Sequence, residues 1–325
     1  MRMTTAGITG RTGWGGRILA LLVALTLPHG AAAAESPPRD YVAIATGPVD
    51  GVYYPVGRAL CARTIAATAA RIHCAALPSP GSSANLDLMR SGEAQMAIIQ
   101  GDIPGYSELV IRDLGVVAGL HEEYLTVVAP PDPRIREIHA LPPRLLRSGP
   151  MGSGHRITAI ILATALGVRA PDPVTLSGRH MAASEFCADD DPVALLLMTG
   201  HPAGNVQELM LNCAARLVPL DSFTITRIRQ RDPAYRAAVI PAGTYRGQER
   251  PVATVSRQAL LVARRDIPPA LVRAVMDAVL EDFEAFTASH PALADLTPLD
   301  FTSPRSRAPR HPAAVAKITM QGQGE

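Results

Sequence analysis

Short polar turns recur where an apolar stretch gives way to a helical pattern, and their residue types suit the binding of a small anion. These turns read GVYYPVG (51–57), PSPGSSAN, GPMGSGHR and HPAGN. Helix N-termini present unpaired backbone N–H groups and a positive dipole end, so several of them around one cleft favour an anion. We expect ligand contacts from Thr46, Tyr53, Tyr54, Ser82, Ser83, Asn85, Gln100, Ser153, Gly154, His155, Arg156, His201 and Pro202.

The chemistry of these side chains fits recognition rather than turnover. Tyrosine, serine and amide groups orient a polar ligand, while backbone N–H groups and Arg156 meet its carboxylate. The same residue types also dominate ordinary turns and helix caps, so a single one of them says little. Their joint placement at corresponding junctions is what indicates a binding site.

Other kinds of site find little support in the sequence. GPMGSGHR lacks the full G-x-G-x-x-G spacing of a dinucleotide site, HEEYL (121–125) is not the H-E-x-x-H zinc motif, and no G-x-S-x-G nucleophile turn exists. The acidic run at 188–192 is typical of a solvated loop rather than a calcium site. Lys317 is the only lysine, which excludes P-loop, Schiff-base and kinase-type sites. We expect no catalytic residue, metal or cofactor.

The first 34 residues predict an export signal. Three arginines precede a short apolar stretch at 18–27 and small residues at 31–34, the order found in a cleaved signal peptide. An uncleaved anchor is the alternative, although the apolar stretch is shorter than the roughly 20 residues of a membrane span. We therefore expect a periplasmic protein. Its net charge of +2 argues against a nucleic-acid or membrane partner, and we expect a monomer.

Four cysteines in an exported chain predict two disulfides, for which three pairings are possible. The pairs close in sequence, Cys61–Cys74 and Cys187–Cys213, are the first choice.

The chain alternates between strand and helix patterns, which predicts an α/β fold with a parallel sheet and covering helices. In the first part, strands at 41–47, 71–77 and 95–101 enclose a helix over 56–68 and a helix capped by Ser82 or Ser83. A crossover at 116–130 leads to a second set of units. Further expected elements are strands at 145–149, near Val174, at 194–200 and at 254–266, and helices at 157–168, 206–211, 225–230 and 268–290.

Several sequence blocks, taken in order, resemble the TAXI family of extracytoplasmic solute receptors of TRAP transporters. These blocks are GVYYPVGRALC, GSSANLDLMRSGEAQMAIIQGD, GSGHRITA, GHPAGNVQE, RLVPLD and IPAGTYRGQERPVATV. The resemblance covers the whole mature chain, and several blocks in order are more specific than any one of them. The four cysteines also lie where they do in one branch of the family.

This resemblance implies a type II periplasmic-binding-protein fold, in which two α/β lobes are joined by a hinge around a ligand cleft. It divides the chain into a signal peptide (1–34), a first part of lobe 1 (40–128), lobe 2 (129–252) and a return to lobe 1 (253–325). The implied ligand is an acidic amino acid or a related dicarboxylate, and the implied partner is a TRAP-type permease.

The chain departs from the family pattern in places that bear on specificity. Pro48 and Asp50 replace a glycine-rich turn, and His155 stands where threonine is common. Asp50 in the cleft would repel a second carboxylate, which disfavours glutamate but not a small carboxylate with a single charge. Two other functions stay open: a receptor that serves a sensor kinase or an ABC importer, and an exported enzyme with His155, His201 or an aspartate as its general base.

Overall fold

The computed structural model describes residues 41–102, 112–132, 135, 137–138, 146–148, 154–167, 186–187 and 194–315. The expected signal peptide, the strand expected near Val174, the acidic run at 188–192 and the site residue Ser153 lie outside these ranges. Among the helices that are described, none has the length and apolarity needed to span a membrane.

The described strands form one mixed sheet. Their bounds are β1 Tyr41–Ala45, β2 His73–Leu77, β3 Met96–Ile99, β4 Leu114–Ala129, β5 Leu146–Ser148, β6 Ala194–Thr199, β7 Arg216–Leu217, β8 Arg236–Ile240 and β9 Val252–Arg264. The strand order is β2-β1-β3-β9-β4-β6-β5, while β7 pairs with β4 and β8 with β9. β1 runs parallel to β2 and β3, and β5 runs parallel to β6.

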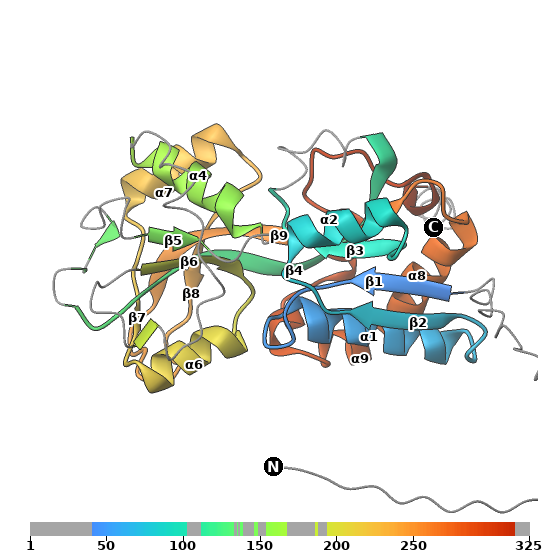
Figure 1. The fold of residues 1–325 in the computed structure, drawn as a ribbon, viewed down its shortest axis with the longest axis horizontal. Helices are drawn as coiled ribbons and strands as arrows, with labels where there is room; N and C mark the ends of the chain where they lie inside the picture. Colours follow the sequence, from blue (N-terminus) through green and yellow to red (C-terminus); the bar gives the residue numbers. More distant parts are fainter. Residues whose placement is uncertain are drawn as a thin grey trace, which may run out of the picture. The chain divides into compact units, whose positions relative to one another are not determined.

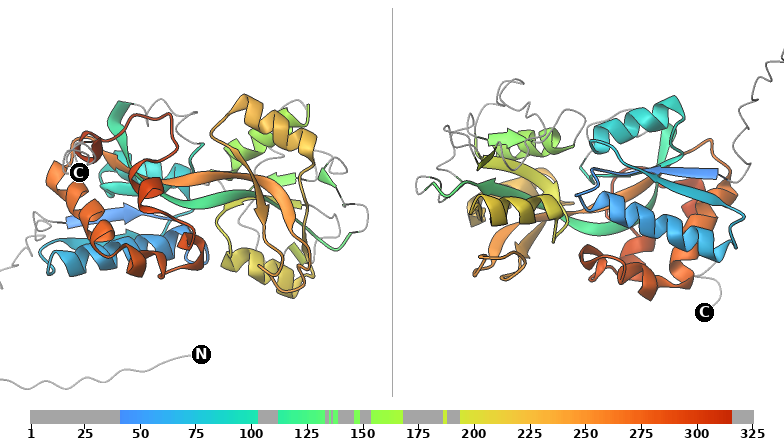
Figure 2. Two further views of the ribbon diagram at one scale, coloured as in Figure 1. Left: turned by 180° about the vertical axis from the view of Figure 1, so that it is seen from behind. Right: turned by 60° about the horizontal axis from the view of Figure 1, so that its bottom comes forward.

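Two long strands, β4 and β9, join the two halves of the sheet (Figures 1 and 2). β9 pairs with β8 at its start and with β3 toward its end, and the last residues of β4 pair with β6. All these pairings are antiparallel, as is β4 with β9. The expectation of a parallel sheet is therefore correct for the pairs within each half and wrong for the strands that connect them. The fold is that of two α/β lobes joined by this pair of strands.

The expected lobe boundaries lie at the end of β4 and at the beginning of β9. β4 ends at Ala129 and β9 begins at Val252, and the sequence predicts the boundaries at 128/129 and 252/253. Since each strand takes part in both halves, β4 and β9 are where we expect the hinge. The division itself stays a prediction.

Helices cover both faces of the sheet. Their bounds are α1 Tyr53–Ala67, α2 Ser82–Ser91, α4 His155–Ala165, α6 Gly204–Asn212, α7 Ser222–Arg231, α8 Pro269–Glu281, α9 Phe283–Thr287, the 3-10 helix η4 Pro291–Leu293 and α10 Pro298–Thr302. Successive strand residues point to opposite faces. In β6, Leu195 and Leu197 accordingly join one core with α1, α6 and α8, whereas Leu196 and Met198 join another with α4. A third core lies between α2 and the first strands.

Three expected helix boundaries are corrected by the structure. α1 begins at Tyr53 rather than Val56, and Gly81 rather than a serine is the N-cap of α2. The helix expected over 268–290 is interrupted at Asp282, whose side chain accepts a hydrogen bond from the backbone N–H of Ala285 and so caps α9. A carboxylate that caps a helix competes with continuation of the preceding one, and periodicity alone does not reveal that competition.

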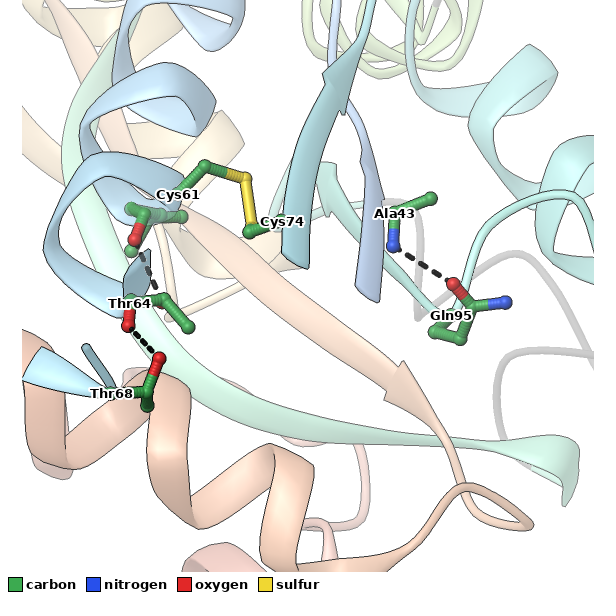
Figure 3. Close-up of a disulfide and its surroundings, with 7 residues drawn as sticks. Ala43, Cys61, Thr64, Thr68, Cys74 and Gln95 are labelled. Atoms are coloured by element: carbon green, nitrogen blue, oxygen red, sulfur yellow. Dashed lines mark hydrogen bonds between the residues drawn. A yellow bond between two sulfur atoms is a disulfide. The ribbon is translucent and has the colours of Figure 1, made fainter. Parts of the chain in front are cut away.

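Both expected disulfides are confirmed. Cys61 of α1 bonds to Cys74 of β2 with a Cα–Cα distance of 4.9 Å (Figure 3). Cys187 bonds to Cys213 with a Cα–Cα distance of 5.0 Å. The first bridge fixes α1 against the edge strand β2, and so holds the helix whose first residue, Tyr53, contacts β4.

Candidate functional site

Polar side chains that are buried or, for Tyr53, half-buried meet at the middle of β4 and β9 from both halves of the fold. We call this group the junction cluster; it consists of Tyr53, Ser82, Gln100, Asp102, Glu123, Thr158, Tyr235 and Arg257. Its members come from the first turns of three helices (α1, α2 and α4), from the residues that follow β3, from the two long strands β4 and β9 and, for Tyr235, from the turn that precedes β8. This is the arrangement expected at the carboxyl ends of strands in an α/β fold, where ligands bind.

Tyr53 and Glu123 form the first link across the junction cluster. The Tyr53 hydroxyl at the start of α1 donates to Glu123 Oε1 on β4 at 2.8 Å. Burial, followed by the nearby Glu123 charge, raises the pKa of Tyr53 well above its usual value. Burial also raises the pKa of Glu123 well above its usual value, although the hydrogen bond from Tyr53 and the charge of Arg257 act against it.

Asp102 links the two lobes. It follows β3 in the first lobe and accepts hydrogen bonds from Thr158 of α4 at 3.0 Å and from the Tyr235 hydroxyl at 2.7 Å. Burial raises its pKa, and the charge of Arg257 is the largest opposing effect. Both donors belong to the other lobe, so separation of the lobes would break these hydrogen bonds to Asp102.

Arg257 supplies the positive charge of the junction cluster. This β9 residue is 3% exposed, forms an ion pair with Asp232 and lies with its guanidinium carbon 5.3 Å from the centre of the Tyr235 ring. It stands directly opposite Glu123 in the β4–β9 ladder. Side chains of directly opposed residues lie on the same face of a sheet, so the two charges face the same space.

The expected site residues of the first lobe are close to one another, but several are used by the protein itself. Asn85 donates to the carbonyls of Thr46 and Ile98, and its own carbonyl oxygen accepts from Ser79. The Thr46 hydroxyl donates to the Leu77 carbonyl at 2.7 Å. We therefore revise the expected roles of Asn85 and Thr46 from ligand contact to positioning of the strand ends.

Ser82 and Gln100 lie nearer the centre of the site. The Ser82 hydroxyl accepts the backbone N–H of Gln100 at 3.0 Å and interacts with Tyr53. The Gln100 amide donates to Thr158 at 3.0 Å, across to the second lobe. The expectation that Ser82 caps its helix is wrong, because its hydroxyl binds the end of β3 instead.

Two glycines allow the lobes to approach at these turns. A Cβ on Gly154 would lie 2.0 Å from Gln100 Oε1, and one on Gly204 would lie 2.9 Å from the carbonyl oxygen of Asp50. Asp50 thus meets the first turn of α6 through its backbone. Four expected contacts, Tyr54, Ser83, His155 and Arg156, are half-buried in the first turns of α1, α2 and α4.

His201 is bound by the protein on both ring nitrogens. Its Nε2 lies 2.9 Å from the Thr126 hydroxyl and its Nδ1 2.5 Å from the Tyr245 hydroxyl. Burial lowers its pKa to about 3, and likewise lowers the pKa of His155 to about 4. Pro202 follows His201 through a cis peptide bond. These contacts favour a structural role for His201 over a ligand contact.

Residues 44–317 match the NMT1-like family. The chain belongs to the NMT1-like family.

Solved structures similar to this NMT1-like chain include binding proteins. The periplasmic aliphatic sulphonate-binding protein SsuA from Escherichia coli is 12% identical with a TM-score of 0.46, and the match covers 87% of this chain and 79% of that one. A TctC solute-binding protein from Polaromonas is 14% identical with a TM-score of 0.43, covering 82% and 89%. The R. palustris protein Rpa4515 with adipate is 14% identical with a TM-score of 0.47, covering 89% and 97%.

Sequence reasoning missed the charged half of the junction cluster. Asp102, Glu123 and Arg257 are at most 3% exposed, and none was among the expected contacts. The signal was present, because Glu123 and Arg257 each interrupt an apolar strand pattern, and a charge inside a buried strand needs a partner or a function. Thr158 and Tyr235 carry no such signal, since their role depends on contacts distant in sequence.

His121 of this NMT1-like protein is a buried histidine next to Tyr53 of the junction cluster. The ring is 1% exposed, lies 5.8 Å from the Tyr53 ring, and has no hydrogen-bond partner on either nitrogen within the described ranges. It borders a cavity of about 70 Å³ beside η4 and α10. Burial, and to a lesser extent His290, lowers the pKa of His121 to about 3.

We expect His121→Leu to make the protein less sensitive to acid. A histidine whose folded pKa lies below its unfolded value of about 6.5 contributes stability above that value and loses it as pH falls toward the folded pKa. Between pH 7 and pH 5 the wild type should lose about 2 kcal/mol more than the variant. Urea unfolding at both pH values measures this, with the exposed His73→Gln as control. Equal losses in wild type and His121→Leu would contradict it.

Proposed function

We propose that this chain is a periplasmic solute receptor that captures a small carboxylate between its two lobes. The observation that carries the proposal is the junction cluster, where side chains of both lobes converge on three helix N-termini at the hinge. Backbone N–H groups at these ends favour a carboxylate. Tyr53, Ser82, Gln100, Gly154, His155 and Arg156 remain the proposed contacts, and Tyr54, Ser83 and Ser153 stay further candidates from the sequence.

Binding without turnover is part of the proposal. The rival enzyme needs a general base whose pKa lies near the working pH. The pKa values of about 4 for His155 and about 3 for His201 are far below that range. His201 is also engaged on both nitrogens. These properties argue against either histidine as a general base.

Native mass spectrometry of protein purified from its own compartment without denaturation tests the proposal. We expect one small organic acid per chain in the native spectrum and the bare polypeptide in the denatured one. A bare chain in the native spectrum, together with no binding from a panel of small carboxylates by calorimetry, would overturn it.

The proposed membrane partner is a TRAP-type permease, and the ordered sequence blocks that resemble the TAXI receptors support it. Crosslinking in intact cells followed by identification of the captured membrane protein tests the partner separately from the ligand. A TRAP permease is expected. Recovery of an ABC permease or a sensor kinase would contradict the partner while leaving the solute-binding role in place.

A further inference from the structure

Glu123 has one oxygen that the described protein does not satisfy. The residue is 1% exposed, and its Oε1 accepts a hydrogen bond from the Tyr53 hydroxyl at 2.8 Å. Oε2 is buried and has no hydrogen-bond partner among the residues that the structure describes. Buried polar groups nearly always have a partner, and leaving a charged one without a partner costs more than leaving a neutral one. The missing partner is expected to arrive with the ligand.

The charges around Glu123 indicate what kind of partner it is. Asp232 forms an ion pair with Arg257, and the charge of Arg257 also acts on Asp102. With Glu123 they make three carboxyl groups near Arg257, the one arginine of the junction cluster. Arg257 stands opposite Glu123 in the ladder but forms its ion pair with Asp232. A positively charged hydrogen-bond donor therefore suits the Glu123 carboxyl group better than a neutral donor does, and better than an anionic ligand group placed beside it.

We propose that the ligand carries a protonated amino group and that Glu123 Oε2 accepts a hydrogen bond from it. This rests on the proposed function, because the carboxylate of the same ligand is assigned to the helix N-termini. Glu123 thereby becomes the residue that separates amino acids from dicarboxylates and simple carboxylates of the same length. Tyr53 holds the carboxyl group in place through Oε1.

If Glu123 accepts a hydrogen bond from a ligand amine, binding should change the protonation of Glu123 as well as favour amines over other carboxylates. Burial raises the pKa of Glu123 in the empty protein, and a bound ammonium group lowers it by favouring the charged form. Binding an amine should therefore release a proton, so affinity rises as pH rises through the raised pKa. A protonated Glu123 that donated to a ligand carboxylate would instead take up a proton on binding and give the opposite slope.

The experiment compares matched probe pairs by titration calorimetry: L-glutamate with glutarate, L-aspartate with succinate, and L-alanine with propanoate. In the best-binding pair the amine is expected to bind about ten- to a hundredfold more tightly, the value of one charge-assisted hydrogen bond. Glu123→Gln keeps an acceptor for Tyr53 and should remove most of that ratio and flatten the pH slope. The exposed Glu249→Gln, also outside the junction cluster, is the matched control.

The outcomes separate this inference from the proposed function. A dicarboxylate that binds as tightly as its amino partner, or an amine preference that survives in Glu123→Gln, overturns the role of Glu123 but not the receptor. Affinity for the amine that falls as pH rises overturns it too. Failure of every probe to bind wild-type protein counts against the proposed function itself. The ratio and slope measured on wild type do not depend on how well the variant folds.

Discussion

Arg257→Met is expected to lower the free energy of unfolding by about 3–5 kcal/mol at pH 7.5, the usual cost of removing one partner of a buried ion pair. Arg257 is 3% exposed, and its guanidinium pairs with Asp232 and opposes the rise in pKa of both Asp102 and Glu123. Methionine has a similar length but leaves these carboxyl groups without a cation. Arg236→Met, on the exposed start of β8, is the matched control.

The pH dependence of the Arg257→Met deficit has a definite sign. Loss of the guanidinium should raise the pKa values of Asp102 and Glu123 further. A carboxyl group with a raised folded pKa stabilises the fold at low pH and loses that contribution as pH rises through the folded pKa. The deficit should therefore be smaller at pH 5 than at pH 7.5. Urea unfolding at both values decides it, and a deficit that is equal or larger at pH 5 would contradict the assigned contacts.

Asn85→Ala is expected to destabilise the empty protein by about 2–4 kcal/mol, because it leaves buried backbone carbonyls without donors. Asn85 is fully buried, and its amide donates to the carbonyls of Thr46 and Ile98. The exposed Asn212→Ala at the end of α6 is the control. Thermal unfolding of both variants without ligand gives the answer. A melting temperature unchanged from wild type would instead favour the original expectation that Asn85 contacts the ligand.

Local signals in the sequence predicted most elements, and contacts distant along the chain account for what they missed. The apolar runs of β1, β3 and β6 and the turns that follow them are readable from residues close in sequence. The antiparallel pairing of β4 with β9 brings together segments more than a hundred residues apart, and no local pattern specifies it. The break at Asp282 was missed because the apolar spacing continues through it.

The residues of the candidate site also divide into those that local sequence signals predict and those that depend on contacts distant along the chain. Tyr53, Ser82 and Gln100 were predicted from turn chemistry, and the structure places them in the junction cluster. Turn chemistry does not distinguish a residue that faces a ligand from one that binds the backbone, and Asn85 is the second kind. Glu123 and Arg257 bring charge to the site from within strands β4 and β9, where turn chemistry gives no signal.

Hydrogen–deuterium exchange with and without the carboxylate found by native mass spectrometry tests the central claim most directly, since it locates where the ligand binds. Saturating ligand is expected to protect the first turns of α1, α2 and α4 and the part of β4 around Glu123, because these segments meet at the junction cluster. The far end of α8 and the exposed face of α7 should exchange as before. Protection confined to those outer segments, with none at the junction, would show that the ligand does not bind between the lobes.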